Sequence, residues 1–507
     1  MFSSLTKQEQ AAIRAPMARH FSVLFIGLFG LLLSACSPSA DDNLTRVAFI
    51  GTPTDMAANG VRLSVAGQHL RAASAEGLVG LNERGEIVPA LAERWIVTDD
   101  GMSYIFRLRN GDWPDGTQLS GENVRSALER NLEQLRGTSL GLDLAIISDI
   151  RAMTGRVVEI RLKSPMPQFL QLLSQPELGL RRNGKGTGPM AAKVSGKQAK
   201  LDVLADGRNG LNPGDDAAEK FRQILILSLS AEEATAAFEN DEVDAVFNGR
   251  LLSLPLADTG PLARGTVRLD VVVGLFGLQV KNSKGILADP ARRAALSMAI
   301  ERETLLDSFG VGGWIPSSGI VPAGLPSEPV EVQQPWAEFA LLDRQAEARR
   351  RISSWKNGEG KGKANLTLAL PRMPGSNQLF MALKEDFDEV GITLVRVGPD
   401  DPADLQLIDR LARYGDARWF LNQFNCSLKR GPCSAEADAL VQTAITETDP
   451  VKRGQILAEA ERALLQSNIY IPLGAPVRWS LIRGGIDGFS ENASGVHPLF
   501  PLAMRPI

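Results

Sequence analysis

The chain has 507 residues, of which 44% are hydrophobic and 22% charged, with a formal net charge of -4. At about 150 residues per domain, this length predicts about three domain-sized units. The ordinary composition excludes collagenous, disordered and multi-span membrane proteins, and the negative charge argues against nucleic-acid binding. Because only three His and three Cys are present, the sequence predicts no metal site, no cofactor and no disulfide framework.

The N-terminus has the pattern of a signal peptide. Lys7, Arg14 and Arg19 form a basic segment, and the apolar run at 21–33 is shorter than the about 20 residues that span a membrane. The run ends at Leu-Ser-Ala-Cys, where Cys36 resembles the lipid acceptor of bacterial lipoproteins. We expect cleavage before this cysteine and anchoring of the mature protein by lipid. The alternative is an ordinary secretory signal followed by an incidental cysteine.

The residue after the acceptor cysteine bears on the membrane involved. In lipoproteins of bacteria with two membranes, Asp at this position marks inner-membrane retention, whereas this chain has Ser37. The pattern therefore favours the periplasmic face of the outer membrane, if the organism has one.

Export also affects the two remaining cysteines. Cys426 and Cys433 would lie in an oxidising compartment, and the turn signal Gly431-Pro432 stands between them. We expect a local disulfide that fixes a loop, the alternative being two unpaired thiols.

Strand and helix patterns alternate along the mature chain. Asp289-Pro290 and Asp449-Pro450 each place Pro in a first helical turn, where its missing N–H is harmless. The Gly-rich, charged segment at 353–363 is expected to be an exposed loop. The expected strands are 104–109, 157–162, 224–229, 243–247, 271–280 and 470–473. The expected helices are 120–135, 231–239, 290–306 and 450–466.

The sequence shows no catalytic constellation. The segment at 186–189 resembles a phosphate-binding loop but lacks the Lys-Ser/Thr ending, so a hinge turn is the better interpretation. No His-Glu-x-x-His motif is present. The carboxylates at 99–100 and 115 stand beside glycines, which favours turns over acid–base chemistry. His69 and His497 have no recognisable partner, and we expect them to be capping or core residues.

A series of short segments gives the strongest indication of a family. They are residues 76–79, 85–95, 99–109, 113–117, 122–124, 186–189, 293–302, 438–465, 471–473 and 488–489. In this order and spacing, the series resembles the peptide/nickel-type extracellular solute-binding proteins of ABC importers, which include oligopeptide- and dipeptide-binding proteins. The resemblance covers most of the mature chain. It implies a monomeric protein that does no chemistry and whose partners are a peptide or small-molecule ligand and the permease and ATPase subunits of an importer.

The resemblance also implies the architecture. The fold would be an α/β clamp of two lobes with an extra lobe, a three-lobe variant built from mixed sheets flanked by helices. The implied boundaries are 1–35 for the signal peptide, 37–75 with 188–271 and 478–507 for the first lobe, 76–187 for the extra lobe and 272–477 for the second lobe. The ligand would be enclosed between the halves, and closure would be a hinge motion.

The segment at 404–422 carries the most informative site residues. In peptide-binding members, the corresponding stretch has a Trp and, three residues later, an Asp that pairs with the peptide's α-ammonium group. Aligning Tyr414 and the segment 420–422 with that pattern puts Arg410 at the Trp position and Arg413 at the Asp position. Because an Arg fork attracts carboxylate or phosphate, we expect an anionic ligand or one with a blocked amine. The alternatives are an alignment shifted by one or two residues, or two solvent-exposed arginines.

Two tryptophans are further candidates for the ligand site. Trp314 lies in a Gly-rich loop, where the family often has a cleft-facing segment, and Trp419 lies close to the two arginines. Either indole could stack on a ligand as a rigid wall. A place in the core or at a lobe edge is the alternative for both.

Three classes of function are compatible with these observations. The first is a lipid-anchored receptor that delivers a peptide-like or anionic small molecule to an ABC importer. The second is an envelope sensor or scaffold that kept the clamp, and a neighbouring permease gene would distinguish the two. The third is an envelope hydrolase, which the missing catalytic constellation disfavours. Hydrolytic activity that is lost when a single residue is mutated would support this class.

Overall fold

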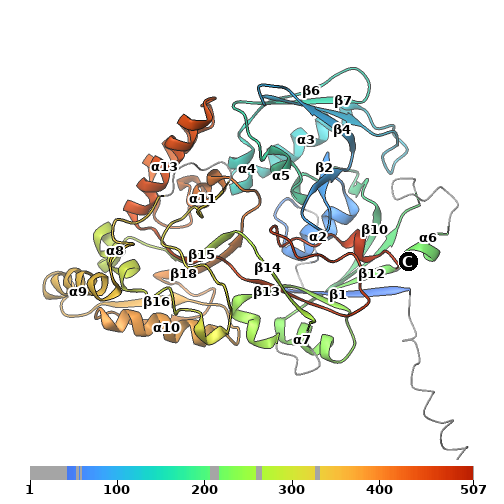
Figure 1. Ribbon diagram of the computed structural model, residues 1–507. Coiled ribbons are helices and arrows are strands. Elements are labelled where there is room, and N and C mark those ends of the chain that lie inside the picture. The colour runs from blue at the N-terminus through green and yellow to red at the C-terminus, as the bar shows by residue number, and fades with distance from the viewer. Residues whose placement is uncertain are drawn as a thin grey trace, which may run out of the picture. The chain divides into compact units, whose positions relative to one another are not determined.

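The computed structural model describes residues 43–52, 56, 60–205, 216–257, 265–325 and 332–505 (Figure 1). The segment Leu44–Ile507 forms one compact unit. The expected signal peptide, Cys36 and Ser37 lie outside the described residues. Within the described ranges, no helix has both the length and the apolar character that a membrane crossing needs.

The first sheet has seven strands in the order β10-β11-β12-β1-β13-β20-β14. Its central strand β1 pairs in parallel with both neighbours. Alternate residues of β1 enter two apolar clusters, with α2 on one face and α7 on the other. Both faces are therefore covered, as is typical of parallel strands. The elements are β1 Leu44–Ile50, β10 Met190–Ser195, β11 Gln198–Val203, β12 Gln223–Leu229, β13 Ala245–Arg250, β14 Val267–Asp270, β20 Arg478–Ile482, α2 Val65–Ser74 and α7 Ala231–Glu239.

The second sheet has five strands in the order β17-β16-β18-β15-β19. Helices α8, α9 and α10 pack with it in a separate apolar cluster, and Figure 1 shows α9 and α10 beside β16. The elements are β15 Gly274–Val280, β16 Asn365–Ala369, β17 Thr393–Val397, β18 Leu405–Leu411, β19 Tyr470–Gly474, α8 Pro290–Ala299, α9 Leu341–Asn357 and α10 Ser376–Glu389.

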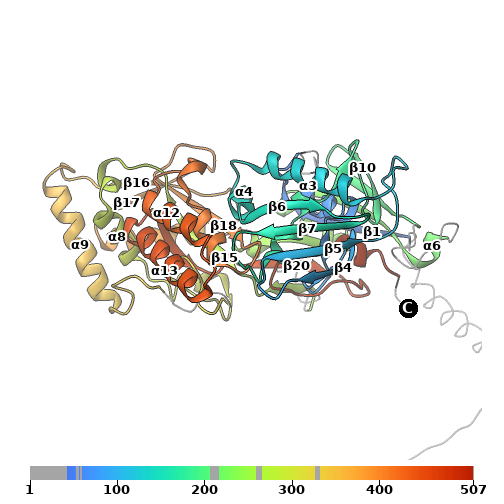
Figure 2. The ribbon, with the colours of Figure 1, turned by 90° about the horizontal axis from the view of Figure 1, so that it is seen from above.

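The third sheet is antiparallel, in the order β4-β5-β7-β6. Helix α3 packs on it, and Ser120 caps that helix through reciprocal bonds with Asn123. The same apolar cluster continues into α11, α12 and α13, and Figure 2 shows α12 and α13 side by side. The elements are β4 Ala92–Val97, β5 Ser103–Leu108, β6 Ile147–Ala152, β7 Val157–Leu162, α3 Gly121–Leu135, α4 Ser139–Leu144, α5 Phe169–Leu173, α11 Ala417–Asn422, α12 Ala435–Ala444 and α13 Pro450–Ser467.

Short elements complete the described chain. Two hairpins consist of β2 with β3 and of β8 with β9. The helices α6 and α14 have four residues each. The bounds are β2 Val79–Leu81, β3 Ile87–Pro89, β8 Arg181–Arg182, β9 Lys185–Gly186, α6 Ala217–Lys220, α14 Leu499–Leu502 and, for the 3-10 helices, Pro176–Leu178, Leu251–Leu256, Gly285–Ala288, Asp307–Phe309 and Cys426–Leu428.

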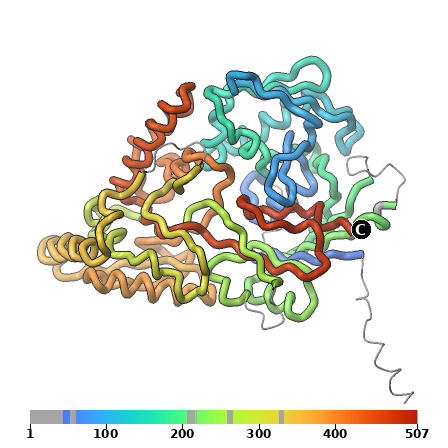
Figure 3. Tube along the Cα trace, in the orientation of Figure 1, coloured from blue at the N-terminus to red at the C-terminus, as the bar shows by residue number. Residues whose placement is uncertain are grey.

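Two short links join the first and second sheets. Residues 271–273 connect β14 to β15, and residues 475–477 connect β19 to β20. Figure 3 shows the returning C-terminal trace beside the green strands of the first sheet, where β20 lies between β13 and β14. The β-rich crossing expected near 271–280 is therefore confirmed as strand β15 preceded by a link.

Most local expectations are confirmed, and two are wrong in part, one at the end of a helix and one at the start of a loop. The helix expected to reach 306 stops at Ala299, because Arg302 donates to the carbonyls of Ser297 and Ile300, which a continuing helix would use itself. The segment at 353–363 is not all loop, because α9 extends to Asn357 and ends at the glycines that follow.

Candidate functional site

A cavity of about 1070 Å³ lies between the first and second sheets. Its wall includes residues from the carboxyl end of β13, the start of β20, the end of β18 and the β2–β3 hairpin. Ligand sites commonly measure about 300–1,000 Å³, so this cavity can hold a short peptide or a comparable solute.

Three of the five predicted ligand residues line this cavity. Arg410, Arg413 and Trp419 are part of its wall, while Tyr414 and Trp314 are not. Trp419 is 3% exposed and packs edge-on against Phe420, with ring centroids 4.9 Å apart. The Trp419 indole is therefore mainly part of the hydrophobic core, and only a small part of it lines the cavity.

The two aromatic expectations that fail have structural roles. Tyr414 is buried beside Asp143 in the apolar cluster that joins the third sheet to α11. Trp314 donates from Nε1 to the carbonyl of Ala475 at 2.8 Å, and its ring lies against Gly474 so closely that a Cβ there would overlap it. Trp314 thus braces the link between β19 and β20 instead of facing ligand.

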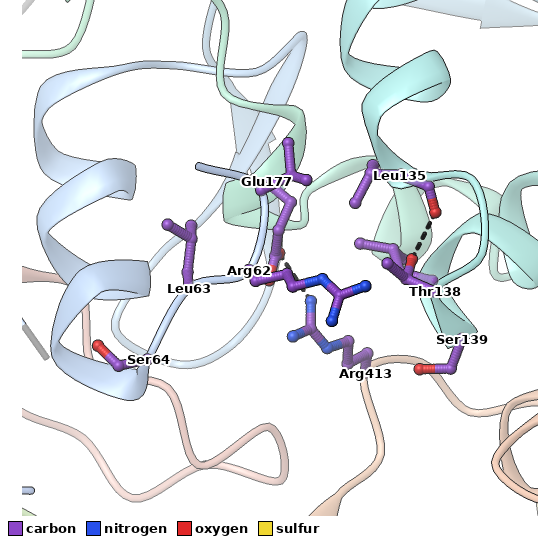
Figure 4. Close-up of a pocket in the computed structure, with 10 residues that line it drawn as sticks. Arg62, Leu63, Ser64, Leu135, Thr138, Ser139, Glu177 and Arg413 are labelled. Carbon is purple, nitrogen blue, oxygen red and sulfur yellow. Dashed lines mark hydrogen bonds and ion pairs between the residues drawn. The ribbon is translucent and has the colours of Figure 1, made fainter. Parts of the chain in front are cut away.

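Arg413 reaches the cavity, but its charge is already paired. Its Nη1 donates to Glu177 Oε2 at 2.7 Å and to Gln175 Oε1 at 3.4 Å. A smaller pocket of about 460 Å³ shares Arg413 with the large cavity. Figure 4 shows Arg62 extending toward Arg413 in this pocket, while the dashed line joins Arg413 to Glu177. The carboxylate of Glu177 therefore takes the role that the sequence assigned to an anionic ligand.

Arg410 belongs to a group of cationic side chains that the sequence analysis did not identify. Arg250 at the end of β13, Arg430 in the loop after α11 and Arg478 at the start of β20 line the same cavity. Arg250 and Arg478 stand directly opposite each other in the β13–β20 pair. Arg478 is balanced by Asp409, with 2.7 Å between Nη1 and Oδ1.

The other three guanidinium groups lack an acidic partner. Within the described part of the chain, no carboxylate forms an ion pair with Arg250, Arg410 or Arg430, which we call the arginine cluster. A single amide oxygen, Gln423 Oε1, accepts from Arg410 at 3.2 Å and from Arg430 at 3.3 Å. Gln423 is 4% exposed, so a buried neutral group holds two like charges together.

The electrostatics of the arginine cluster agree with this geometry. The pKa of Arg410 is lowered to about 10, chiefly by burial and then by the neighbouring positive charges of Arg430 and Arg250. The pKa of Arg430 is also lowered, by burial and then by the charge of Arg62. A pKa of about 10 keeps Arg410 protonated at neutral pH, and the arginines together form a region of concentrated positive charge.

The disulfide lies in the loop that carries Arg430. The structure joins Cys426 and Cys433, whose Cα atoms are 5.2 Å apart. Arg430 also donates to the carbonyl of Gln423 at 3.1 Å. The position of Arg430 at the cavity is therefore set by a short covalent loop and by a buried glutamine.

The two described histidines also line the cavity. His497 contacts Asp270 at 3.0 Å, and His69 contacts the carbonyl of Val65 at 2.9 Å. Burial lowers the pKa of His69 to about 4. Both histidines are buried, which confirms the expectation of core residues. Among the described residues, no group of three or more His, Cys, Asp or Glu side chains is placed to hold a metal.

A second charged group lies at the junction of α4 and α11, away from the cavity wall. Asp143 accepts from Asn422 at 2.7 Å, and Arg418 lies 3.4 Å from Asp416. Burial raises the pKa of Asp143 to about 7, even though Asn422 and Arg418 favour its ionised form. With the adjacent Tyr414, these residues form what we call the junction cluster.

Two sheets joined by two short links, with a cavity lined by residues of both, define a binding-protein clamp. A family model, "Bacterial extracellular solute-binding proteins, family 5 Middle", matches residues 86–425. This is more than half of the chain, which therefore belongs to the family of extracellular solute-binding proteins, a family of binding proteins and not of enzymes.

Individual relatives agree with this assignment. The periplasmic oligopeptide-binding protein OppA of Salmonella typhimurium is 20% identical over 465 residues, covering 82% of this chain and 84% of its own. The glutathione-binding protein GsiB of Escherichia coli is 23% identical over 513 residues, covering 93% and 94%. The structure of Haemophilus influenzae OppA with the peptide RPPGFSPFR has a TM-score of 0.78 at 16% identity, covering 92% of this chain and 100% of that one. The expected α/β clamp with mixed sheets flanked by helices is thus confirmed.

Proposed function

We propose that this protein is an extracytoplasmic receptor that encloses a peptide-like or anionic solute in its cavity and delivers it to an ABC importer. The observation that carries the proposal is the cavity wall, which draws residues from both sheets. A ligand touching both sheets would stabilise their approach, and the links 271–273 and 475–477 would serve as the hinge. The lobe boundaries stated from the sequence follow the same division and are part of this proposal.

The relatives support a peptide-like solute. OppA of Salmonella typhimurium is named for oligopeptides and GsiB of Escherichia coli for glutathione. Arg413 lines this chain's cavity at the position where peptide-binding members have the Asp that pairs with the α-ammonium group, so we expect weak binding of unmodified peptide N-termini. We also expect no turnover of the bound solute.

The test is to identify what the protein carries. The full chain is purified from its native host without denaturation, then unfolded, and the released small molecules are identified by mass spectrometry. Cells lacking the gene should fail to take up the identified solute. A preparation that releases no solute, together with unimpaired uptake in the deletion strain, would contradict the receptor function.

We further propose that the protein is a monomer anchored through lipid on Cys36, with Ser37 directing it to the outer membrane in a host with two membranes. The signal pattern at 1–35 supports this, as described above. Membrane fractionation of the wild type and of Cys36→Ser provides the test, because the variant should leave the membrane fraction. Equal membrane association of both would exclude the lipid anchor.

A further inference from the structure

The arginine cluster has an unusual construction for a structural feature. Buried charges are normally paired, because an unpaired charge removed from water destabilises the fold. Arg478, in the same wall, follows this rule through Asp409. The half-buried Arg250, Arg410 and Arg430 have no such partner among the described residues, and Gln423 offers Arg410 and Arg430 a dipole but no charge.

The three guanidinium groups come from different parts of the fold. Arg250 ends a strand of the first sheet, Arg410 lies in β18 of the second sheet, and Arg430 is held by the disulfide loop. All three line the cavity, so their unused N–H donors are available to a solute inside it. Guanidinium forks match the paired oxygens of carboxylate and phosphate groups.

We infer that the arginine cluster is an anion subsite for a solute with two or more adjacent anionic oxygen groups, either carboxylates or phosphates. The inference deepens the proposed receptor function and rests on it. One negative charge would leave most of the cluster unbalanced, whereas two or more would balance it and tie the first sheet to the second. Arg413 takes no part in the subsite, because Glu177 already neutralises it.

One substitution in the arginine cluster should stabilise the ligand-free protein instead of destabilising it. Without an anion, the cluster holds three like charges close together, so removing one charge should relieve repulsion. Arg410→Gln should therefore raise the melting temperature of the ligand-free protein, by about 1 °C for a chain of this length. Removing an arginine that only stabilised the fold would instead lower the melting temperature.

The experiment measures anion binding to the full-length protein after bound solutes have been removed. Citrate and pyrophosphate serve as probes with adjacent carboxylates or phosphates, and acetate at equal ionic strength serves as the single-charge control. Calorimetric titration and melting temperatures are recorded for the wild type, Arg410→Gln and Arg430→Gln. Arg462→Gln is the matched control, because Arg462 is exposed on α13 and equally removes one positive charge.

The expected result is binding of citrate or pyrophosphate by the wild type and by Arg462→Gln, and at least tenfold weaker binding by both cluster variants. Tighter binding of citrate would indicate a carboxylate ligand, and tighter binding of pyrophosphate would indicate a phosphate ligand. Equal effects of acetate and both probes, or equal loss in Arg462→Gln, would overturn the subsite. If neutral trialanine binds while neither probe does, the receptor function stands and the anion subsite falls. If no probe or peptide binds and the native protein carries no solute, the receptor function itself fails.

Discussion

The junction cluster has one buried arginine and the arginine cluster has three half-buried ones, and the two clusters balance this charge differently. At the junction, Arg418 lies beside Asp416 and near Asp143, so positive and negative groups compensate each other. At the cavity, Arg410 and Arg430 share the amide oxygen of Gln423, and no carboxylate among the described residues forms an ion pair with them or with Arg250. One cluster is therefore balanced within the chain and the other is not.

The difference teaches how to separate structural charge from functional charge. A buried ion pair that is complete within the chain needs nothing further, and removing one partner damages the fold. A cluster that is incomplete within the chain is stabilised from outside, here by the solute that we propose. The following changes test this contrast, from the largest expected effect to the smallest.

Removing the junction arginine should have the largest effect. Arg418→Met leaves the buried Asp416 and Asp143 without their cation, and the free energy of unfolding should fall by about 3–5 kcal/mol. Urea denaturation measures the change. Exposed Arg462→Gln is the control, and a loss no larger than that of the control would remove the contrast between the two clusters.

The junction cluster should also make stability depend on pH. The folded-state pKa of Asp143, about 7, lies above its ordinary value of 3.8, so between these values the folded protein holds a proton that the unfolded chain has released. The free energy of unfolding should therefore fall as pH rises from about 4 to about 7, by at most about 1.4 kcal/mol per pH unit.

The control is Asp143→Asn, which keeps an acceptor for Asn422 but does not titrate. The difference in unfolding free energy between the wild type and this variant should change across the interval from pH 4 to pH 7 and stay constant above it. Parallel pH profiles for the two proteins would show that Asp143 titrates normally.

Breaking the disulfide should have an intermediate effect on stability. The closed loop is short, with a sequence separation of 7, so replacing both Cys426 and Cys433 with Ser should cost about 2 kcal/mol. Because this loop carries Arg430, citrate or pyrophosphate binding should weaken as well. Comparison with reduced wild-type protein controls for the substitutions, and unchanged anion affinity would mean that Gln423 alone positions Arg430.

The smallest effect should come from freeing Arg413. Glu177→Gln keeps an acceptor oxygen but removes the negative charge, so Arg413 becomes another unbalanced cation at the cavity. We expect two- to fivefold tighter anion binding, which is about 0.5–1 kcal/mol for this partly exposed group. The double variant Glu177→Gln with Arg413→Gln should return the affinity to that of the wild type, and an affinity unaffected by either change would place Arg413 outside the ligand's reach.

The sequence predicted the local elements well where the signal itself was local. The strand at 157–162 and the helix at 231–239 have the predicted bounds, and Asp449 caps α13 as its Asp-Pro pattern indicates. The turn aspartates also behave as expected, since Asp100 and Asp115 accept from backbone N–H groups two residues later. These features depend on neighbours within a few residues, so composition and spacing suffice to predict them.

The ordered motifs likewise determined the family and the α/β class, and they pointed to Arg410 and Arg413. The sequence alone did not say which of these charges is free. Arg413 is neutralised by Glu177, 236 residues away, and Arg410 faces Arg250 from another sheet. Trp314 and Tyr414 look like ligand residues in the sequence but are held by Ala475 and by the α4–α11 junction. Charge balance and burial depend on contacts between distant segments, so only the tertiary structure decided which side chains complete the fold and which remain for a solute.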